Sequence, residues 1–262
     1  MGILNVTPDS FSDGGAYRSV EEAVARGLEM EAEGAAILDV GGESTRPGSF
    51  PVPADEEMRR VIPVIRGLAA KTNAVISVDT TKAAVANAAV AAGARIVNDT
   101  SALADDPEMA AAVRASGAAV VLMHRRGSPA TMQETPHYDA LFDELLAELT
   151  GRIAAAEGAG IDRERILVDP GIGFGKRLCD NLALHRHLDR LRVLGRPIVF
   201  GPSRKSFLGS LTGAPAAERV FGTAAAVAAA VLRGAHVVRV HDVKEMREVV
   251  EVAYAIRGEA SW

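Results

Sequence analysis

Residues 31–42, with the sequence EAEGAAILDVGG, contain the unit that repeats along this chain. A polar, alanine-rich stretch ends at Gly34, Ala35 follows, and the apolar run 36–41 carries one acidic residue, Asp39, near its end. Glycine suits the left-handed position that terminates a helix, and a short apolar run after it is typical of a buried strand. The segment therefore predicts a helix that leads into a strand.

The same unit returns through the 262 residues, and the Gly-Ala pair recurs at 93–94, 117–118 and 234–235. The runs predicted as strands are 2–6, 36–41, 75–79, 95–99, 119–124, 166–169, 197–201 and 236–241. The segments predicted as helices are about 20–33, 54–71, 82–92, 107–116, 138–158, 182–194, 217–233 and 243–256.

Strands that are apolar throughout and alternate with helices indicate a parallel sheet covered on its faces. Eight such units in one chain predict an α/β fold, a single (β/α)8 TIM barrel with its site at the C-terminal ends of the strands. A doubly wound open sheet is the alternative, but it usually has a glycine-rich turn after its first strand, which the loop after Val6 lacks. No linker or change of composition divides the chain, so we expect one domain over residues 1–262.

Composition excludes several classes of function. The net charge of −5 gives no general attraction for nucleic acid or for an anionic membrane. Cys179 is the single cysteine, which excludes an internal disulfide framework and suits a reducing cytoplasm. The longest apolar run, 224–232, is too short to span a bilayer, and no signal segment leads the chain. We therefore expect a cytoplasmic protein without nucleic-acid or membrane partners.

Nearly every predicted strand ends in a residue that can hydrogen-bond or ionise. These residues are Asn5, Asp39 with Glu43, Asp79, Asn98 with Asp99, His124, Asp169, Ser203-Arg204-Lys205, and Arg239 with His241. Any one of them alone fits a cap or a turn. All eight strands carry such a residue at the same end, where the active site of a barrel lies, and this pattern favours a site.

The residue types at this end form two groups. Amide and carboxylate groups suited to the N–H and C=O edges of a flat heterocycle occur at Asp79, Asn98 and Asp169. Groups that can converge on an anion occur at Arg46, Lys205, Arg239 and His241, and Asn5 offers an oxygen to a hard cation. Together they indicate a planar heterocycle joined to a phosphate-type leaving group.

Two other motifs do not support a site. The segment DPGIGFGK at 169–176 lacks the outer glycine and the Ser/Thr of a phosphate-binding P-loop, so we expect its glycines to form a tight turn close to a ligand. His185 and His187 lie two apart in a helical segment and point to different faces, which argues against a metal site. Nothing marks Cys179 as a nucleophile.

The chain resembles the dihydropteroate synthase family in eight motifs, in order and at matching spacing. They are MGILNVTPDSFSDGG at 1–15, DVGGESTRPG at 39–48, SVDT at 77–80, VND at 97–99, LMH at 122–124, DPGIGFGK at 169–176, SRKSFLG at 203–209 and RVHDV at 239–243. The resemblance implies condensation of 6-hydroxymethyl-7,8-dihydropterin diphosphate with p-aminobenzoate, through a dissociative, SN1-like route. The products are 7,8-dihydropteroate and pyrophosphate, and sulfonamides occupy the p-aminobenzoate site.

Two alternatives share this barrel. Corrinoid-dependent methyltetrahydrofolate methyltransferases lack SRKSF and the first two loop motifs in this form. A non-catalytic paralogue should have lost pterin or diphosphate residues, and none is lost here.

The resemblance also implies a role for each matching residue. The pterin would be bound by Asp79, Asn98, Met123, Asp169, Phe174, Lys205 and Arg239. The diphosphate would be bound by Asn5, Thr45, Arg46, Arg239 and His241, with Mg2+ on Asn5. The p-aminobenzoate would be bound by Phe11, Pro47, Lys205 and Ser206. The residues nearest the chemistry would be Lys205, Arg239, His241 and Asp169.

The sequence departs from the family pattern in three places. Members usually carry about 10–20 residues before this first strand, at the barrel end away from the site, so we expect their absence to affect stability more than activity. Pro202 stands before SRK and restricts Gly201 to extended geometry. Arg125 and Arg126 follow the fifth strand, where they either add positive charge near the diphosphate or face solvent, and we expect them to face solvent. The family is commonly homodimeric, and we expect the same here.

Overall fold

Eight parallel strands, each followed by at least one helix, form the fold of the computed structural model, which describes residues 1–6, 19–44 and 49–258. The strands are β1 (Gly2–Asn5), β2 (Ile37–Gly41), β3 (Val75–Asp79), β4 (Ile96–Asp99), β5 (Ala119–Met123), β6 (Ile166–Asp169), β7 (Val199–Phe200) and β8 (Val237–Val238). Strands β1 to β6 pair in sequence order, and β7 pairs with β8.

Two parallel bridges join these sheets into a closed barrel. Val168 pairs with Ile198, and its amide donates a 3.0 Å hydrogen bond to the carbonyl of Pro197. On the other side Gly2 pairs with Val240, and the amide of Ile3 donates to the carbonyl of Val240 at 2.9 Å. The prediction of a (β/α)8 barrel is therefore confirmed, and the open sheet is wrong.

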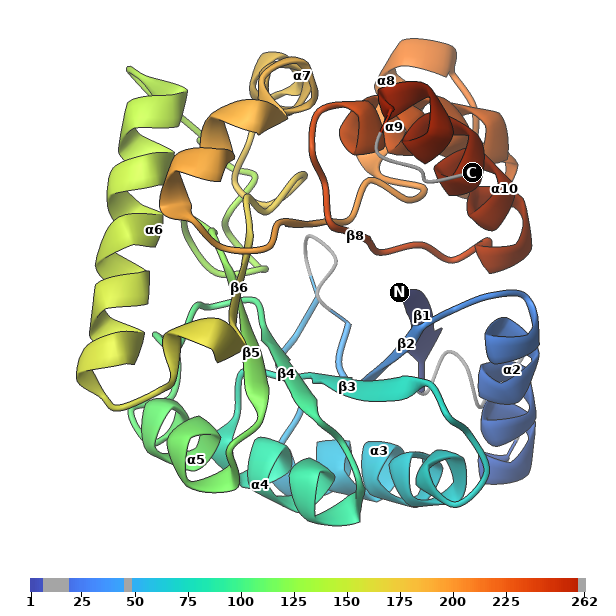
Figure 1. The fold of residues 1–262 in the computed structure, drawn as a ribbon. Coiled ribbons are helices and arrows are strands. Elements are labelled where there is room, and N and C mark those ends of the chain that lie inside the picture. Colours follow the sequence, from blue (N-terminus) through green and yellow to red (C-terminus); the bar gives the residue numbers. More distant parts are fainter. Residues whose placement is uncertain (7–18, 45–48, 259–262) are drawn as a thin grey trace.

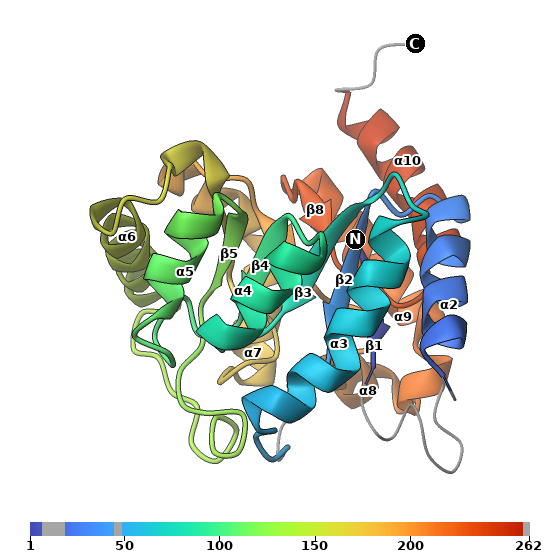
Figure 2. The ribbon, with the colours of Figure 1, turned by 90° about the horizontal axis from the view of Figure 1, so that it is seen from below.

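The helices form a ring outside the strands (Figure 1; Figure 2 gives the view from below). They are α2 (Val20–Ala32), α3 (Ala54–Ala69), α4 (Ala83–Ala92), α5 (Met109–Ser116), α6 (Leu141–Gly158), α7 (Leu178–Arg186), α8 (Ser206–Thr212), α9 (Val220–Leu232) and α10 (Val243–Arg257). The glycines of the four Gly-Ala joints all have positive φ, between 65° and 124°, as the helix-terminating role requires. Among the described helices none is long and apolar enough to cross a membrane.

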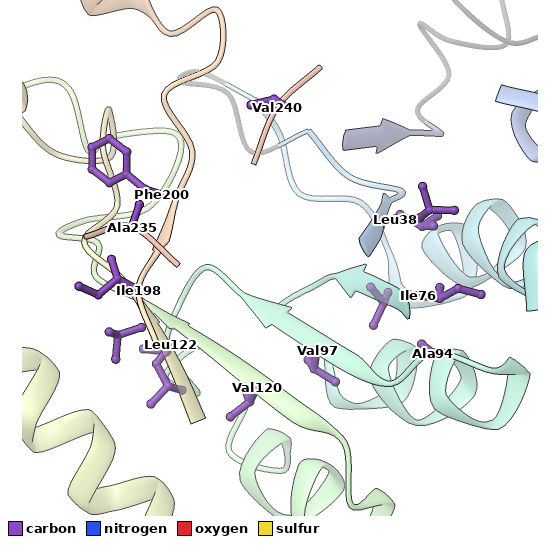
Figure 3. Packing of buried hydrophobic residues seen from close by; sticks show 14 of the residues in the cluster. Leu38, Ile76, Ala94, Val97, Val120, Leu122, Ile198, Phe200, Ala235 and Val240 are labelled. Carbon is purple, nitrogen blue, oxygen red and sulfur yellow. The ribbon is translucent and has the colours of Figure 1, made fainter. Parts of the chain in front are cut away.

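The hydrophobic core has two layers because successive side chains of a strand point to opposite faces. The larger layer lies between strands and helices, and includes Leu38, Ile76, Val97, Val120 and Leu122 (Figure 3). The smaller layer fills the barrel and contains the fully or partly buried side chains of Ile37, Ile96, Ala119, Val121, Leu167, Val199 and Val237. Both faces of each strand are thus apolar at its start, which explains the continuous apolar runs in the sequence.

Three predicted elements differ from the structure. The helix predicted at 182–194 is two elements, α7 and a 3-10 helix at Leu188–Leu194. The chain leaves helical geometry at His187, and α7 begins earlier because Asp180 accepts hydrogen bonds from the backbone and side chain of Arg177. The last two strands are shorter than predicted. A short helix, α8, begins at Ser206.

Candidate active site

The site lies at the C-terminal ends of the strands, above the apolar filling of the barrel. The two-residue period of a strand places Asp39, two residues after Ile37, on the inner face. The same count from the other inner residues leads to Asn98, Met123, Asp169, Gly201 and Arg239. The cross-strand register sets Gly41 beside Asn5 and Asp79, and Asp79 beside Asn98. Polar side chains from separate strands therefore form one layer.

Asp39 and Arg239 are at the centre of a buried network. Asp39 Oδ2 accepts hydrogen bonds from Asn98 Nδ2 at 3.0 Å and from Arg239 Nε at 2.6 Å. Arg239 Nη2 donates to Asp79 Oδ2 at 2.8 Å. One guanidinium therefore links two carboxylates from adjacent strands, and the Asp39 carboxylate is fully buried. Charge-assisted bonds of this kind hold the side chains in fixed directions.

Burial perturbs the charges of the site. Removal from water raises the pKa of Asp79 above its ordinary value, although the Arg239 guanidinium opposes that change. Burial also raises the pKa of Asp169, whose Oδ1 accepts a 2.7 Å hydrogen bond from the amide of Gly171. Desolvation lowers the pKa of the Lys205 ammonium to about 8. Groups that titrate near neutrality are typical of binding and catalytic sites.

A small cavity of about 20 Å³ brings together all seven residues predicted to bind the pterin. Its lining includes Asp79, Asn98, Met123, Asp169, Phe174, Lys205 and Arg239. Met123 and Phe174 pack against one another and Met132 as a separate apolar cluster. Lys205 Nζ lies 4.0 Å from the centroid of the Phe174 ring, in a cation–π contact. The cavity thus has apolar faces and a polar edge.

His241 and Lys205 are fixed by the turn after β7. Ser203 Oγ lies 2.9 Å from His241 Nδ1 and accepts from the His241 amide at 3.1 Å. Arg204 has a positive φ of 57°, and its guanidinium pairs with Asp242 instead of entering the site. Lys205 is the residue before α8, and Ser206 is the exposed first residue of that helix.

Asn5 lies beside the carboxylates of the same layer. A carbon placed at the Cβ position of Gly41 would be 3.7 Å from Asn5 Oδ1 and 3.8 Å from Asp79 Oδ2, so the two oxygens border the same space. Hard oxygen donors of this type suit Mg2+. Among the described residues no three His, Cys, Asp or Glu side chains gather as a metal site. The donors fit a cation that takes most of its ligands from a bound anion.

A larger cavity of about 340 Å³ adjoins the small one, and both include Asp79 and Thr100 in their linings. Lys82 lines it and binds Glu43 Oε2 and Glu57 Oε2, each at 2.6 Å. Arg125 also lines it and donates two hydrogen bonds to Asp105, at 2.9 and 2.8 Å. The expectation that Arg125 faces solvent is wrong, because only 7% of its side chain is exposed. Both cations are paired with carboxylates, and the apolar residues of the described lining are Pro51, Pro129 and Ala130.

Several strand-end residues do not belong to the site. Asp99 turns outward and accepts bonds from the backbone of Ser101 and Leu103. His124 lies 3.0 Å from Glu148 Oε2 on α6, outside the barrel. Arg126 also points away from the site. It pairs with Glu144 and Glu148, and its guanidinium lies over the ring of Tyr138. Four predicted residues, Phe11, Thr45, Arg46 and Pro47, lie outside the described part of the chain.

The glycines of 169–176 form the expected tight turn, and two of them pack against the protein's own backbone. A Cβ on Gly171 would lie 1.9 Å from the carbonyl oxygen of His124, and one on Gly175 would lie 2.6 Å from that of Arg126. Both glycines have positive φ. They therefore allow the loop after β6 to pack closely against the chain that follows β5, and Gly171 also lines the small cavity.

Sequence reasoning placed Asp39 and Ser203 among the strand-end residues but assigned neither a specific role, although both hold proposed site residues. The signal for Asp39 is present in the sequence, because Ile37, Asp39 and Gly41 alternate on the inner face of one strand. No comparable signal identifies Ser203, because its contact with His241 joins positions 38 residues apart.

The chain matches known proteins along nearly its whole length. The family model for pterin binding enzymes matches residues 1–241. Dihydropteroate synthase of Escherichia coli K12 is 46% identical over 255 residues, which cover 97% of this chain and 90% of that protein. The Yersinia pestis dihydropteroate synthase, in complex with a sulfonamide drug, superposes with a TM-score of 0.95 at 43% identity, covering 98% and 94% of the two chains.

A further solved structure is dihydropteroate synthase of Xanthomonas albilineans in complex with 7,8-dihydropteroate. It superposes with a TM-score of 0.88 at 49% identity, and the match covers 98% of this chain and 92% of that one. These likenesses cover the barrel and the loops at its C-terminal end. The chain therefore belongs to the dihydropteroate synthases, transferases of folate biosynthesis within the pterin-binding enzyme family.

Proposed function

We propose that the pterin of 6-hydroxymethyl-7,8-dihydropterin diphosphate binds in the small cavity, with its N–H edge toward Asp79, Asn98 and Asp169. The observation that carries this proposal is the convergence of these three side chains with Lys205 and Arg239 on one cavity. Carboxylates that face ring N–H groups give directional recognition. Met123 and Phe174 would cover one face of the ring, and the Arg239 guanidinium would stack on the other.

Binding of a bicyclic ring requires side chains to move. A cavity of about 20 Å³ has room for little more than one water molecule. Arg239 holds Asp79 through a hydrogen bond of 2.8 Å, so the two groups that would bind one substrate are bound to each other. We infer that the pterin displaces Arg239 from Asp79, while the contact of Arg239 with Asp39 guides the guanidinium to its stacking position.

The diphosphate would lie above the pterin, near Asn5, Arg239 and His241. Thr45 and Arg46, from the loop after β2, complete this part of the proposal. Asn5 would hold Mg2+, and the ion would supply positive charge to the leaving group. Ser203 would keep His241 in the direction needed to donate a proton or hydrogen bond to a phosphate oxygen.

p-Aminobenzoate would place its carboxylate at Ser206 and its ring near Lys205, with Phe11 and Pro47 covering it. Sulfonamides would compete for the same position. The start of α8 presents backbone N–H groups there, and such groups favour an anion. The amine of p-aminobenzoate would then point toward the pterin carbon that carries the diphosphate.

The reaction needs no nucleophile from the protein. The carbon–oxygen bond to the diphosphate breaks, its electron pair leaves with pyrophosphate, and the electron-rich dihydropterin delocalises the resulting cation. The nitrogen of p-aminobenzoate then forms the new bond and loses a proton. Arg239 and His241 stabilise the charge on the leaving group, and Lys205 and Asp169 hold the heterocycle in line.

The remaining parts of the proposal concern the protein as a whole. We propose that residues 1–262 act as one domain, in the cytoplasm, as a homodimer. Exposed apolar side chains on α9 and α10 support a contact between copies, among them Phe221, Val252 and Ile256.

A coupled assay that measures pyrophosphate release by the purified protein in the presence of Mg2+ tests the proposed reaction. We expect release only when both the pterin diphosphate and p-aminobenzoate are present, and we expect a sulfonamide to compete with p-aminobenzoate. Mass spectrometry should identify 7,8-dihydropteroate as the second product. No release in the presence of both substrates would overturn the proposal.

A further inference from the structure

Lys176, at the end of the loop after β6, carries a buried ammonium group that the proposed reaction does not use. The residue is 3% exposed, and three acceptors surround its Nζ. They are His124 Nδ1 at 3.0 Å, the carbonyl oxygen of Phe174 at 3.1 Å and the carbonyl oxygen of His124 at 3.4 Å. An ammonium has three protons to donate, so these contacts use all of them.

The three acceptors belong to the two segments that carry the apolar wall of the pterin cavity. His124 directly follows Met123, and Phe174 is itself part of that wall. The segments are also joined by a 2.8 Å hydrogen bond from the His124 amide to the Asp169 carbonyl, and by close packing of Gly171 against the His124 carbonyl. Lys176 therefore fastens the backbone after β5 to the loop after β6, at the level where both segments contact the cavity.

The surroundings of His124 determine which of its ring nitrogens accepts the hydrogen bond from Lys176. His124 Nε2 lies 3.0 Å from Glu148 Oε2, which favours a proton on Nε2 and leaves Nδ1 with its lone pair toward Lys176. Burial lowers the pKa of His124, so the ring is neutral and can accept at Nδ1. Burial lowers the pKa of Lys176 to about 7, and the carboxylate of Asp169 opposes this change by attracting the ammonium.

We infer that Lys176 is a positioning residue for the pterin: its ammonium fixes Phe174 relative to Met123 and thereby sets the apolar face on which the heterocycle rests. The inference depends on the proposed function, because it assigns Lys176 to the same pterin site.

The test compares Lys176→Met with the matched surface variant Lys71→Met, whose side chain is exposed. We expect Lys176→Met to raise the KM for the pterin diphosphate by about tenfold or more, since small misplacements in a site are costly. We expect the KM for p-aminobenzoate to stay within about twofold and Lys71→Met to behave as the wild type. Lys176→Gln, which keeps two N–H donors, should recover part of the pterin affinity.

Each outcome decides the matter. A folded Lys176→Met protein with a wild-type KM for the pterin diphosphate would overturn the inference, as would an equal rise in both KM values. Failure of both the Met and Gln variants to fold would also overturn it, because Lys176 would then be a residue of the core. Wild-type protein that releases no pyrophosphate would instead overturn the proposed function, and the wild-type control reveals that case first.

Discussion

Arg239 Nη2 donates a hydrogen bond of 2.8 Å to Asp79 Oδ2, across the mouth of the barrel. Arg239 follows the last strand and Asp79 ends the third, so the contact joins positions 160 residues apart. Asp39 holds the same guanidinium from the second strand at 2.6 Å. We propose that pterin binding exchanges the Asp79 contact for a contact with the ring, whereas Asp39 stays bound to Arg239.

Replacement of Asp39 by Asn tests this division of roles. The amide keeps the shape of the side chain but loses the charge that Arg239 and Asn98 both contact. We expect the KM for the pterin diphosphate to rise by about tenfold, or about 1.4 kcal/mol, near the lower end of the range for a lost hydrogen bond to a charged group. Steady-state kinetics measure it, with the exposed Asp55→Asn as control. An unchanged KM would show that Asp39 does not position Arg239.

Asp169→Asn should weaken pterin binding more strongly. Its Oδ1 can still accept from the Gly171 amide, so the local fold is kept. The other end of the group becomes an N–H donor that faces the N–H edge of the ring, and we expect affinity to fall by about 100-fold, in line with the cost of an unpaired buried donor. Isothermal titration calorimetry with the pterin provides the measurement. Equal affinity for both proteins would refute the role of Asp169.

Binding of the pterin should weaken at alkaline pH because of Lys205. Burial lowers the pKa of its ammonium to about 8, so the charge offered to the pterin carbonyl disappears as the pH rises above that value. The KM for the pterin diphosphate should therefore increase between pH 7 and 9, and this limb should be absent in Lys205→Met. A profile that is the same in both proteins would contradict the assignment.

The same shift affects stability with the opposite sign. The pKa of Lys205 falls from 10.5 to about 8 on folding, so the unfolded chain binds more protons between these values. The contribution of Lys205 to the free energy of unfolding therefore increases with pH over that range. Urea denaturation at pH 8 and pH 10 should show a larger increase in the wild type than in Lys205→Met, which keeps the lowered pKa of Lys176.

Ser203→Ala should slow the departure of the leaving group. The hydroxyl lies 2.9 Å from His241 Nδ1 and accepts from the His241 backbone, so its loss releases the imidazole from its fixed direction. We expect kcat to fall by about tenfold, the usual scale for a lost orienting hydrogen bond, with little change in the KM for p-aminobenzoate. Ser210→Ala, at an exposed position of α8, is the control. A kcat equal to that of the wild type would leave Ser203 with a structural role only.

The barrel and most of its strand positions could be predicted from the sequence because the relevant signals are local. Each Gly-Ala joint marks the end of a helix, and each strand is apolar on both faces. The side-chain period also contains information that the prediction did not use. Alternate side chains of a strand share a face, so Val121 and Met123 point into the barrel and His124 points out of it. The structure has His124 on that outer side.

Other features depend on contacts between distant segments and have no local signal. Arg125 is buried by its pairing with Asp105, which is set by how two loops pack. The division of the predicted helix 182–194 depends on the contacts of Arg177 and Asp180 and on the backbone turn at His187. The three contacts of Lys176 require the loops after β5 and β6 to be in place.

We propose above all that Asp79, Asn98 and Asp169 recognise the pterin by hydrogen bonds to the edge of its ring. The most direct test is a crystal structure of the protein with bound 7,8-dihydropteroate. We expect ring N–H and C=O groups within about 3.2 Å of all three side chains, with Arg239 released from Asp79. A heterocycle bound instead in the larger cavity, beside Lys82 and Arg125, would contradict it.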